Sequence, residues 1–110
     1  FEQNLIFTAL KYIEDNYKTG TLEELAALTG RPDYYISKLI KRHAGHTFKT
    51  LLQIKRLNQA AFLLTTTRLP VENIITLVGY DNTSYFHRIF KEHFGVTPRV
   101  YRLEEKREKL

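Results

Sequence analysis

Two groups of polar side chains, about fifty residues apart in this 110-residue chain, are of types that bond to the edges of DNA bases. Arg and Lys can donate to guanine O6 and N7, Ser and Thr can meet several base edges, and Tyr can pack on a thymine methyl group. The predicted base-contacting residues are Tyr34, Ser37 and Lys38 in the first group and Thr83, Ser84, His87 and Arg88 in the second. For each of them a solvated polar helix face is the alternative interpretation.

Three basic residues follow these groups and suit a different contact. Lys41 and Arg42 come after the first group, and Lys91 comes after the second. The first turns of a helix that enters a DNA groove are the ones that reach the bases. We therefore predict that these later residues contact phosphates, which position a protein on DNA without reading its sequence.

Both groups lie in an internal repeat. Residues 22–30 match 71–79 at an offset of 49. Residues 36–41 and 43–47 match 86–91 and 93–97 at an offset of 50. Each copy has the pattern of a short helix, a glycine-containing turn, a longer basic helix and a final glycine. This pattern is typical of a helix-turn-helix, whose second helix can enter a major groove. Ordinary packing of a helical hairpin is the alternative.

The two predicted turns differ at the point where their helices cross. Ala26 supplies the small side chain that a close crossing needs, whereas Ile75 stands at the equivalent position of the second copy. Because isoleucine is bulkier, we expect the second pair of helices to cross more widely or to pack differently.

The rest of the chain predicts an all-α fold of seven helices, since no segment shows the alternation of a strand. Thr21 and Glu24 form a capping box, Gly45 and Gly95 end helices, and the β-branched run at 65–67 ends another. The predicted helices are 3–17, 22–28, 32–44, 48–65, 71–78, 82–94 and one that starts near Pro98 and frays over 104–110.

Apolar residues at helical spacing predict which helix faces point inward. The expected inward residues of the first helix are Leu5, Ile6, Ala9, Leu10, Ile13 and Tyr17. Those of the two recognition helices are Ile36, Leu39, Ile40, Phe86, Ile89, Phe90 and Phe94.

The long helix at 48–65 has a geometric meaning besides that of a core helix. About 18 residues at ~1.5 Å each give ~27 Å, and helix ends and side-chain reach bring the two recognition helices to about one DNA turn, ~34 Å. We therefore expect two recognition helices in successive major grooves. The predicted organisation is an N-terminal helix-turn-helix unit at 1–46, a linker helix at 47–66 and a C-terminal unit at 67–110.

Composition supports a polyanionic partner and excludes several other classes. The net charge is +5, and it is uneven: residues 1–30 carry −3 and residues 31–110 carry +8. The absence of cysteine excludes disulfide scaffolds and thiolate metal sites. His43 and His46 have no carboxylate pair at ligand spacing, and no catalytic constellation is visible, so we predict no metal, no cofactor and no enzyme activity. No apolar run approaches the ~18 residues of a membrane span, and the first residues do not show the pattern of a signal peptide.

Three stretches carry a resemblance to a known family. Residues 56–64, 78–91 and 94–102 resemble the linker helix and the C-terminal signature of the AraC/XylS family of bacterial transcription regulators, within a match from about Thr21 to Arg102. The resemblance implies seven helices, with two helix-turn-helix units joined by a long helix. It places the family's base-reading positions on the same seven residues named above.

The resemblance also implies partners beyond double-stranded DNA. A separate sensing or dimerising domain is usual, and this chain has no methionine and begins within a helical pattern, so we expect it to be the DNA-binding end of a longer protein. RNA polymerase is the expected partner if the protein activates transcription, and the bacterial cytoplasm, at the nucleoid, is the expected location.

Two other functions remain open from the residues alone. The chain could be a helical protein-interaction module with an acidic partner, or a non-specific binder of nucleic acid or of a membrane surface. The repeated glycine turn and inward set favour sequence-specific DNA binding, because a non-specific basic binder needs only charge.

Overall fold

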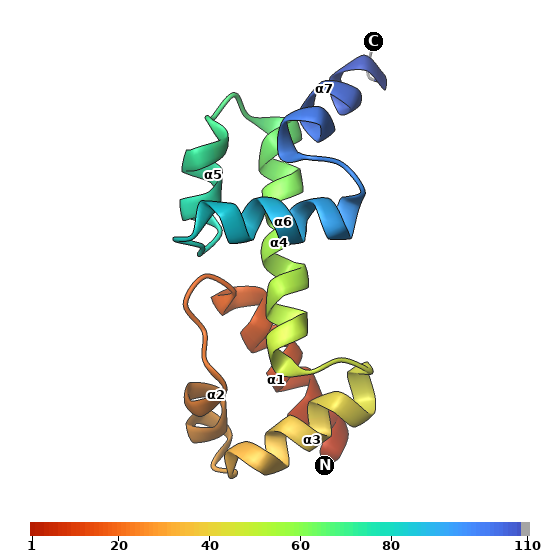
Figure 1. Ribbon diagram of the computed structural model, residues 1–110. Coiled ribbons are helices and arrows are strands. Elements are labelled where there is room, and N and C mark those ends of the chain that lie inside the picture. Colours follow the sequence, from red (N-terminus) through yellow and green to blue (C-terminus); the bar gives the residue numbers. More distant parts are fainter. Residues whose placement is uncertain (109–110) are drawn as a thin grey trace. The chain divides into compact units, whose positions relative to one another are not determined.

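The computed structural model describes residues 1–108, with side chains up to Glu105, and it is helical throughout, with no strand in that range (Figure 1). The helices are α1 (Glu2–Asn16), α2 (Leu22–Thr29), α3 (Asp33–Ala44), α4 (Phe48–Thr66), α5 (Val71–Leu77), α6 (Thr83–Phe94) and α7 (Pro98–Glu108). The predicted all-α fold with seven helices is thus confirmed. The expected fraying from Glu104 is not seen as far as Glu108, and residues 109–110 lie outside the described range.

The chain divides into two compact units, Phe1–Lys55 and Arg56–Leu110, and the division falls inside α4. Each unit has the same order of elements: a scaffold helix, a short helix, a recognition helix and the start of a following helix. The scaffold helix is α1 in the first unit and the second half of α4 in the second. The repeat therefore extends beyond the helix-turn-helix to a whole packing unit.

Helix starts agree with the sequence to within a residue or two, and caps explain the differences. Thr21 caps α2, as predicted, by accepting from the backbone N–H of Glu24 at 3.1 Å. Asn82 caps α6 by accepting from the N–H of Tyr85 at 2.9 Å, so it stands before this helix and not in it. Pro32 likewise lies just before α3, at its N-cap, because its extended backbone is not helical.

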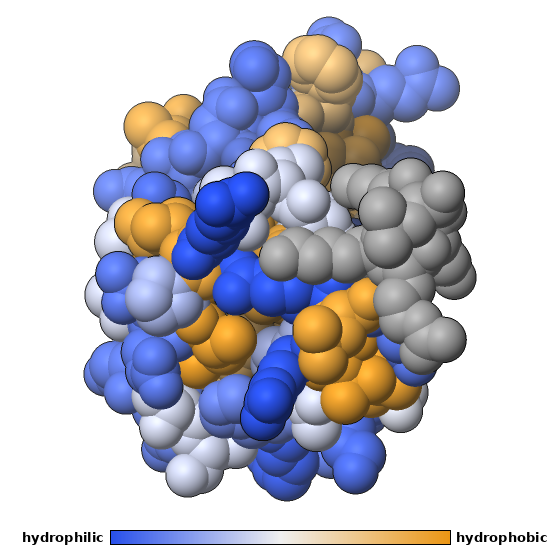
Figure 2. Space-filling view, turned by 90° about the horizontal axis from the view of Figure 1, so that it is seen from above, coloured by the Kyte–Doolittle hydropathy of each residue, from blue (hydrophilic) through white to orange (hydrophobic). Residues whose placement is uncertain are grey.

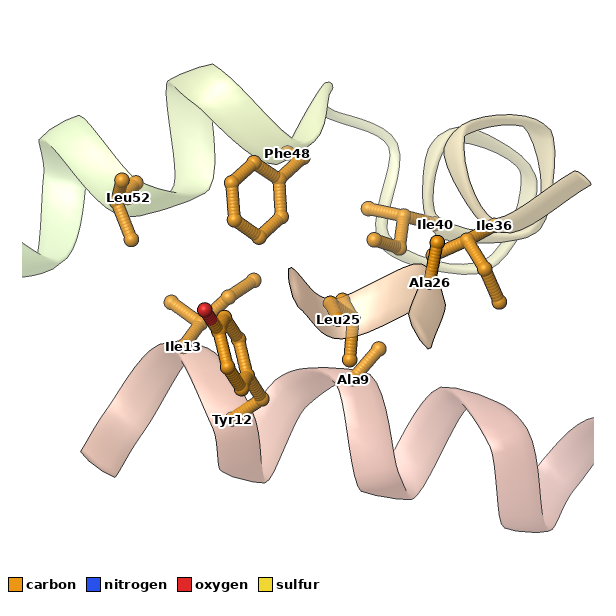
Figure 3. Packing of buried hydrophobic residues seen from close by; sticks show 9 residues of the cluster. All are labelled: Ala9, Tyr12, Ile13, Leu25, Ala26, Ile36, Ile40, Phe48 and Leu52. Carbon is orange, nitrogen blue, oxygen red and sulfur yellow. The ribbon is translucent and has the colours of Figure 1, made fainter. Parts of the chain in front are cut away.

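The core of the first unit gathers side chains from α1, α2, α3 and the start of α4 (Figure 3). Ala9, Leu25, Ile36 and Ile40 are almost fully buried at its centre, and the rings of Tyr12 and Phe48 lie 6.3 Å apart at one side. These apolar contacts hold α3 by its inner face, so its outer face remains exposed.

The core of the second unit is aromatic. Phe86 and Phe90 of α6 are fully buried with centroids 5.6 Å apart, and Phe94 packs 4.5 Å from Phe90 while remaining half-buried. From α4 and α5, Leu57, Leu64 and Ile74 complete the interior; like the two phenylalanines they are at most 1% exposed. The predicted inward set of both recognition helices is confirmed, with Phe94 at the margin.

The predicted inward face of α1 was partly wrong. Leu10 is 44% exposed, whereas Tyr12, which the apolar pattern did not select, is only 6% exposed. Tyr12 lies between Ala9 and Ile13 on the buried side, and its hydroxyl finds polar partners there. The inward stripe of α1 is therefore centred nearer Tyr12 than the apolar residues alone indicate.

The surface mixes polar and apolar side chains. On the face shown in Figure 2, hydrophobic residues form separate patches among hydrophilic ones. Isolated exposed apolar residues are normal for folded domains. Within the described part of the chain, none of the helices combines the length and the apolar character that crossing a membrane requires.

Candidate nucleic-acid interface

The two recognition helices are built alike. Both α3 and α6 contain 12 residues, begin fifty positions apart and end at a glycine with a left-handed backbone, Gly45 (φ 76°) and Gly95 (φ 82°). Each buries one apolar face and exposes a polar, basic one. The structure therefore gives each unit one exposed helix face that carries the predicted base-contacting residues.

The helix-turn-helix turns are also equivalent. Gly30 donates to the carbonyl of Ala27 and Arg31 to that of Ala26, and Gly79 and Tyr80 make the same two bonds to Thr76 and Ile75, all at 3.1–3.3 Å. Ala26 and Ile75 are both buried, at 3% and 1% exposure. The turn thus keeps its hydrogen bonds although the second copy has the bulkier residue.

Three of the five α3 residues predicted to contact DNA line a shallow groove. Tyr34, which is 69% exposed, lines a groove of about 450 Å³ together with Tyr35, Lys38 and Arg42. Tyr35 was not among the predicted residues; the apolar-versus-polar pattern of α3 gave no signal for it, because its ring is half-buried. Ser37 is also half-buried, whereas Lys38 and Lys41 are exposed.

Arg42 has an acidic partner within its own unit. Its Nη2 lies 2.7 Å from Oε1 of Glu2, and Nε2 of the neighbouring His43 lies 3.5 Å from Oε2 of the same carboxylate. The Arg42 side chain is 61% exposed, so a phosphate can approach it, but it would compete with Glu2. The predicted phosphate contact of Arg42 therefore requires exchange of one anion for another.

All five predicted α6 residues, Thr83, Ser84, His87, Arg88 and Lys91, are exposed. Arg88 is held along the helix: Nη1 lies 3.0 Å from Oε1 of Glu92, and its guanidinium lies 5.1 Å from the centre of the Tyr85 ring. An exposed pair at i, i+4 contributes only about 0.3–0.5 kcal/mol. It nevertheless favours one direction of the guanidinium, towards the C-terminal half of the helix.

A second tyrosine supports α6 from behind. Tyr80 follows the turn, packs 5.7 Å from the Phe86 ring and lies under the Arg56 guanidinium at 5.1 Å. Burial raises the pKa of the Tyr80 hydroxyl, and the positive charge of Arg56 partly offsets this. Tyr80 therefore stays protonated and links α4 to the start of the recognition helix.

The polar side chains of the two units do not cluster like metal ligands. Within the residues that the structure describes, no three His, Cys, Asp or Glu side chains gather where they could hold a metal ion. The exposed polar groups of α3 and α6 are instead donors and acceptors spread along a helix, an arrangement suited to a long polyanionic ligand.

Comparison with known proteins identifies this architecture. A family model described as a helix-turn-helix domain matches residues 25–104. The F1 operon positive regulatory protein of Yersinia pestis is 32% identical over 104 residues, which are 93% of this chain and 35% of that protein. The raffinose operon transcriptional regulatory protein RafR of Pediococcus pentosaceus is 34% identical over 95 residues, 86% of this chain and 34% of that protein.

Solved structures agree. The C-terminal domain of AraT, a response regulator from Geobacillus stearothermophilus, superposes with a TM-score of 0.84 at 36% identity over 91% of this chain and 84% of that one. The chain spans about a third of the length of the curated relatives described above. The chain has two helix-turn-helix units with exposed recognition faces, and its relatives are regulators. It therefore belongs to the AraC/XylS family of transcription regulators, as a DNA-binding domain.

Proposed function

We propose that this domain binds double-stranded DNA sequence-specifically, with α3 and α6 each entering a major groove. The observation that carries the proposal is the duplication: two helices of equal length present base-compatible side chains at matching positions. Ser84, His87 and Arg88 occupy the places in α6 that Tyr34, Ser37 and Lys38 occupy in α3. Different side chains at equivalent places would read different bases, so the preferred site would be bipartite and asymmetric.

Charge supports the same partner. Residues 31–110 carry +8, and the exposed side chains of Lys41, Arg42 and Lys91 lie on the C-terminal halves of the two recognition helices. Contacts there would fix the helices on the phosphate backbone, while residues in the first two turns read bases. Regulation of transcription in a bacterial cytoplasm follows from this role. A sensing or dimerising domain, and contact with RNA polymerase at activated promoters, belong to the same proposal, since the relatives are longer.

Selection of binding sites from random duplexes tests the proposal. We expect the 110-residue chain to enrich two short base clusters, and Arg88→Ala to relax the preference within one of them. Lys11→Ala is the matched control, because Lys11 is an exposed cation of α1, paired with Asp15, outside both recognition helices. Its selected site should equal that of the unaltered chain.

Other outcomes would assign a different function. Tight binding without any enriched sequence would indicate a non-specific nucleic-acid binder. No binding to duplexes at low salt would indicate a basic protein-interaction module with an acidic partner.

A further inference from the structure

One arginine of α7 holds the connection that leads into α5. Nε of Arg102 donates to the carbonyl of Leu64 at 2.9 Å, and Nη2 donates to the carbonyls of Leu69 at 2.7 Å and of Thr67 at 3.4 Å. Leu64 lies in the last turn of α4, whereas Thr67 and Leu69 lie in the connection. A single half-buried side chain thus joins three carbonyls along six residues of backbone.

This segment needs donors from elsewhere. The last carbonyls of a helix have no partner within it, and the connection ends in Pro70, which has no N–H to donate. The hydroxyl of Thr67 bonds back to Leu63 at 2.6 Å, and Pro70 gives α5 no side-chain capping bond. The guanidinium fork supplies several donors from one group, and its charge suits the negative end of α4.

The first unit solves the same problem locally. There Gly20 donates to the carbonyl of Asn16 at 2.7 Å, Thr21 caps α2, and the Tyr12 hydroxyl accepts from the N–H of Thr21 at 2.9 Å. At an offset of 50 the position of Arg102 is occupied by Leu52, a core residue. The support of the short helix therefore comes from within the connected segments in the first unit and from α7 in the second.

The adjacent residue of α7 reaches the recognition helix. The Tyr101 ring packs against Phe90 of α6 with centroids 5.7 Å apart and against Phe94 at 5.1 Å. Because Arg102 and Tyr101 are neighbours, α7 connects the α4–α5 segment to α6. Loss of the Arg102 hydrogen bonds would let α5 and α6 shift together relative to α4.

We propose that Arg102 is a positioning residue for DNA reading: by fixing the α4–α5 connection it sets the orientation of α6, and thereby the base preference of the second unit. This inference rests on the proposed function. Arg102 need not touch DNA itself. Because it acts through α6, its effect must appear only in the half of the DNA site that α6 reads.

Hydrogen exchange of the protein without DNA tests whether the Arg102 hydrogen bonds hold the α4–α5 connection. In Arg102→Gln, amides over residues 67–78 should exchange at least about tenfold faster, while the amides of α1–α3 keep their rates. Arg99→Gln is the matched control, since Arg99 is an exposed arginine of the same helix and its loss removes the same charge. Arg102→Lys, which keeps the charge but lacks the fork, should fall between. Unchanged exchange in Arg102→Gln would overturn the proposal.

Site selection well below each variant's melting midpoint tests the consequence. Discrimination in the half of the site that Arg88→Ala relaxes should fall about tenfold in Arg102→Gln, which corresponds to about 1.4 kcal/mol, and the other half should be retained. If Arg102→Gln does not fold, Arg102→Lys takes its place in this test.

Two results would contradict this role. Intact preference in both halves would make Arg102 a purely structural residue. If the slope of log K against log salt becomes shallower by about 0.9 in Arg102→Gln but not in Arg99→Gln, Arg102 is a phosphate ligand. If the unaltered chain enriches no sequence, the proposed function fails, and the exchange experiment still decides whether Arg102 holds the connection.

Discussion

The Tyr12 hydroxyl donates to Oε1 of Glu24 at 2.5 Å and joins α1 to the first turn of α2. The same oxygen accepts the N–H of Thr21, so one buried group satisfies both the cap residue of α2 and a carboxylate near its positive end. A Cβ on Gly20 would lie 2.6 Å from the carbonyl oxygen of Asn16 and 3.0 Å from the Tyr12 ring. The chain therefore passes close to Tyr12 only because residue 20 is glycine.

The first prediction follows from this contact. Tyr12→Phe should lower the free energy of unfolding by about 1–3 kcal/mol at neutral pH, because the Thr21 N–H and the Glu24 carboxylate lose a partner. Burial first, and then the bond to Glu24, raise the pKa of the Tyr12 hydroxyl above its ordinary value of 10.0. Its contribution is thus complete below pH 10 and is lost as the pH rises through the folded-state value.

Chemical denaturation between pH 7 and 11 measures this difference. The gap between the unaltered chain and Tyr12→Phe should narrow above pH 10. Tyr34→Phe, at an exposed tyrosine of the same unit, is the control and should change little. If the difference in free energy of unfolding stays constant to pH 11, ionisation of the Tyr12 hydroxyl does not affect stability, and the prediction is wrong.

Salt dependence is the second prediction. Each phosphate neutralised contributes about −0.9 to the slope of log K against log salt concentration. Removing Lys41, Arg42 or Lys91 singly should make the slope shallower by about that amount, while Lys11→Ala should leave it unchanged. Fluorescence anisotropy across a salt series measures the slopes. A slope near zero for the unaltered chain would remove the electrostatic part of the proposal.

The third prediction separates the two faces of α6. Arg88→Ala should cost about 1–3 kcal/mol of discrimination at one base position and leave the thermal midpoint almost unchanged, because Arg88 is exposed. Phe86→Ala should destabilise the fold by about 3–5 kcal/mol, because Phe86 is fully buried. Melting curves and competition binding on single-base variants measure both. Equal weakening on every DNA sequence would reassign Arg88 to a phosphate contact.

Periodicity predicted the helices and most of the core because those features depend on local sequence. The apolar spacing of α3 and α6 identified Ile36, Ile40, Phe86 and Phe90, all fully buried. The glycine after each recognition helix marked the end of that helix, because glycine has no Cβ and adopts the left-handed backbone conformation without steric cost.

Partners from distant segments could not be predicted in this way. Arg42 was assigned to phosphate from its place on α3, but its Glu2 partner lies 40 residues away and meets it only in the folded unit. The bonds of Arg102 to the end of α4 and to the connection that follows it span 33 to 38 residues, and nothing in the local pattern of α7 indicates them. Tyr12 was missed because its buried hydroxyl is polar, and its use depends on where Thr21 and Glu24 arrive.

The last prediction concerns the spacing of the two base clusters. If both units bind at once, inserting about half a turn, ~5 bp, between the clusters carries the second to the opposite face of the duplex. We expect binding to fall towards that of a single unit, provided that α4, helical from Phe48 to Thr66, behaves as a stiff connection. A full-turn insertion restores the face but not the distance, so rescue should be incomplete. Competition assays on the spacing series measure this. If the half-turn insertion does not change the affinity, either only one unit enters a groove or α4 bends. Arg88→Ala on the same spacing series separates these cases. If the second unit is not engaged, Arg88→Ala leaves the affinity unchanged at every spacing.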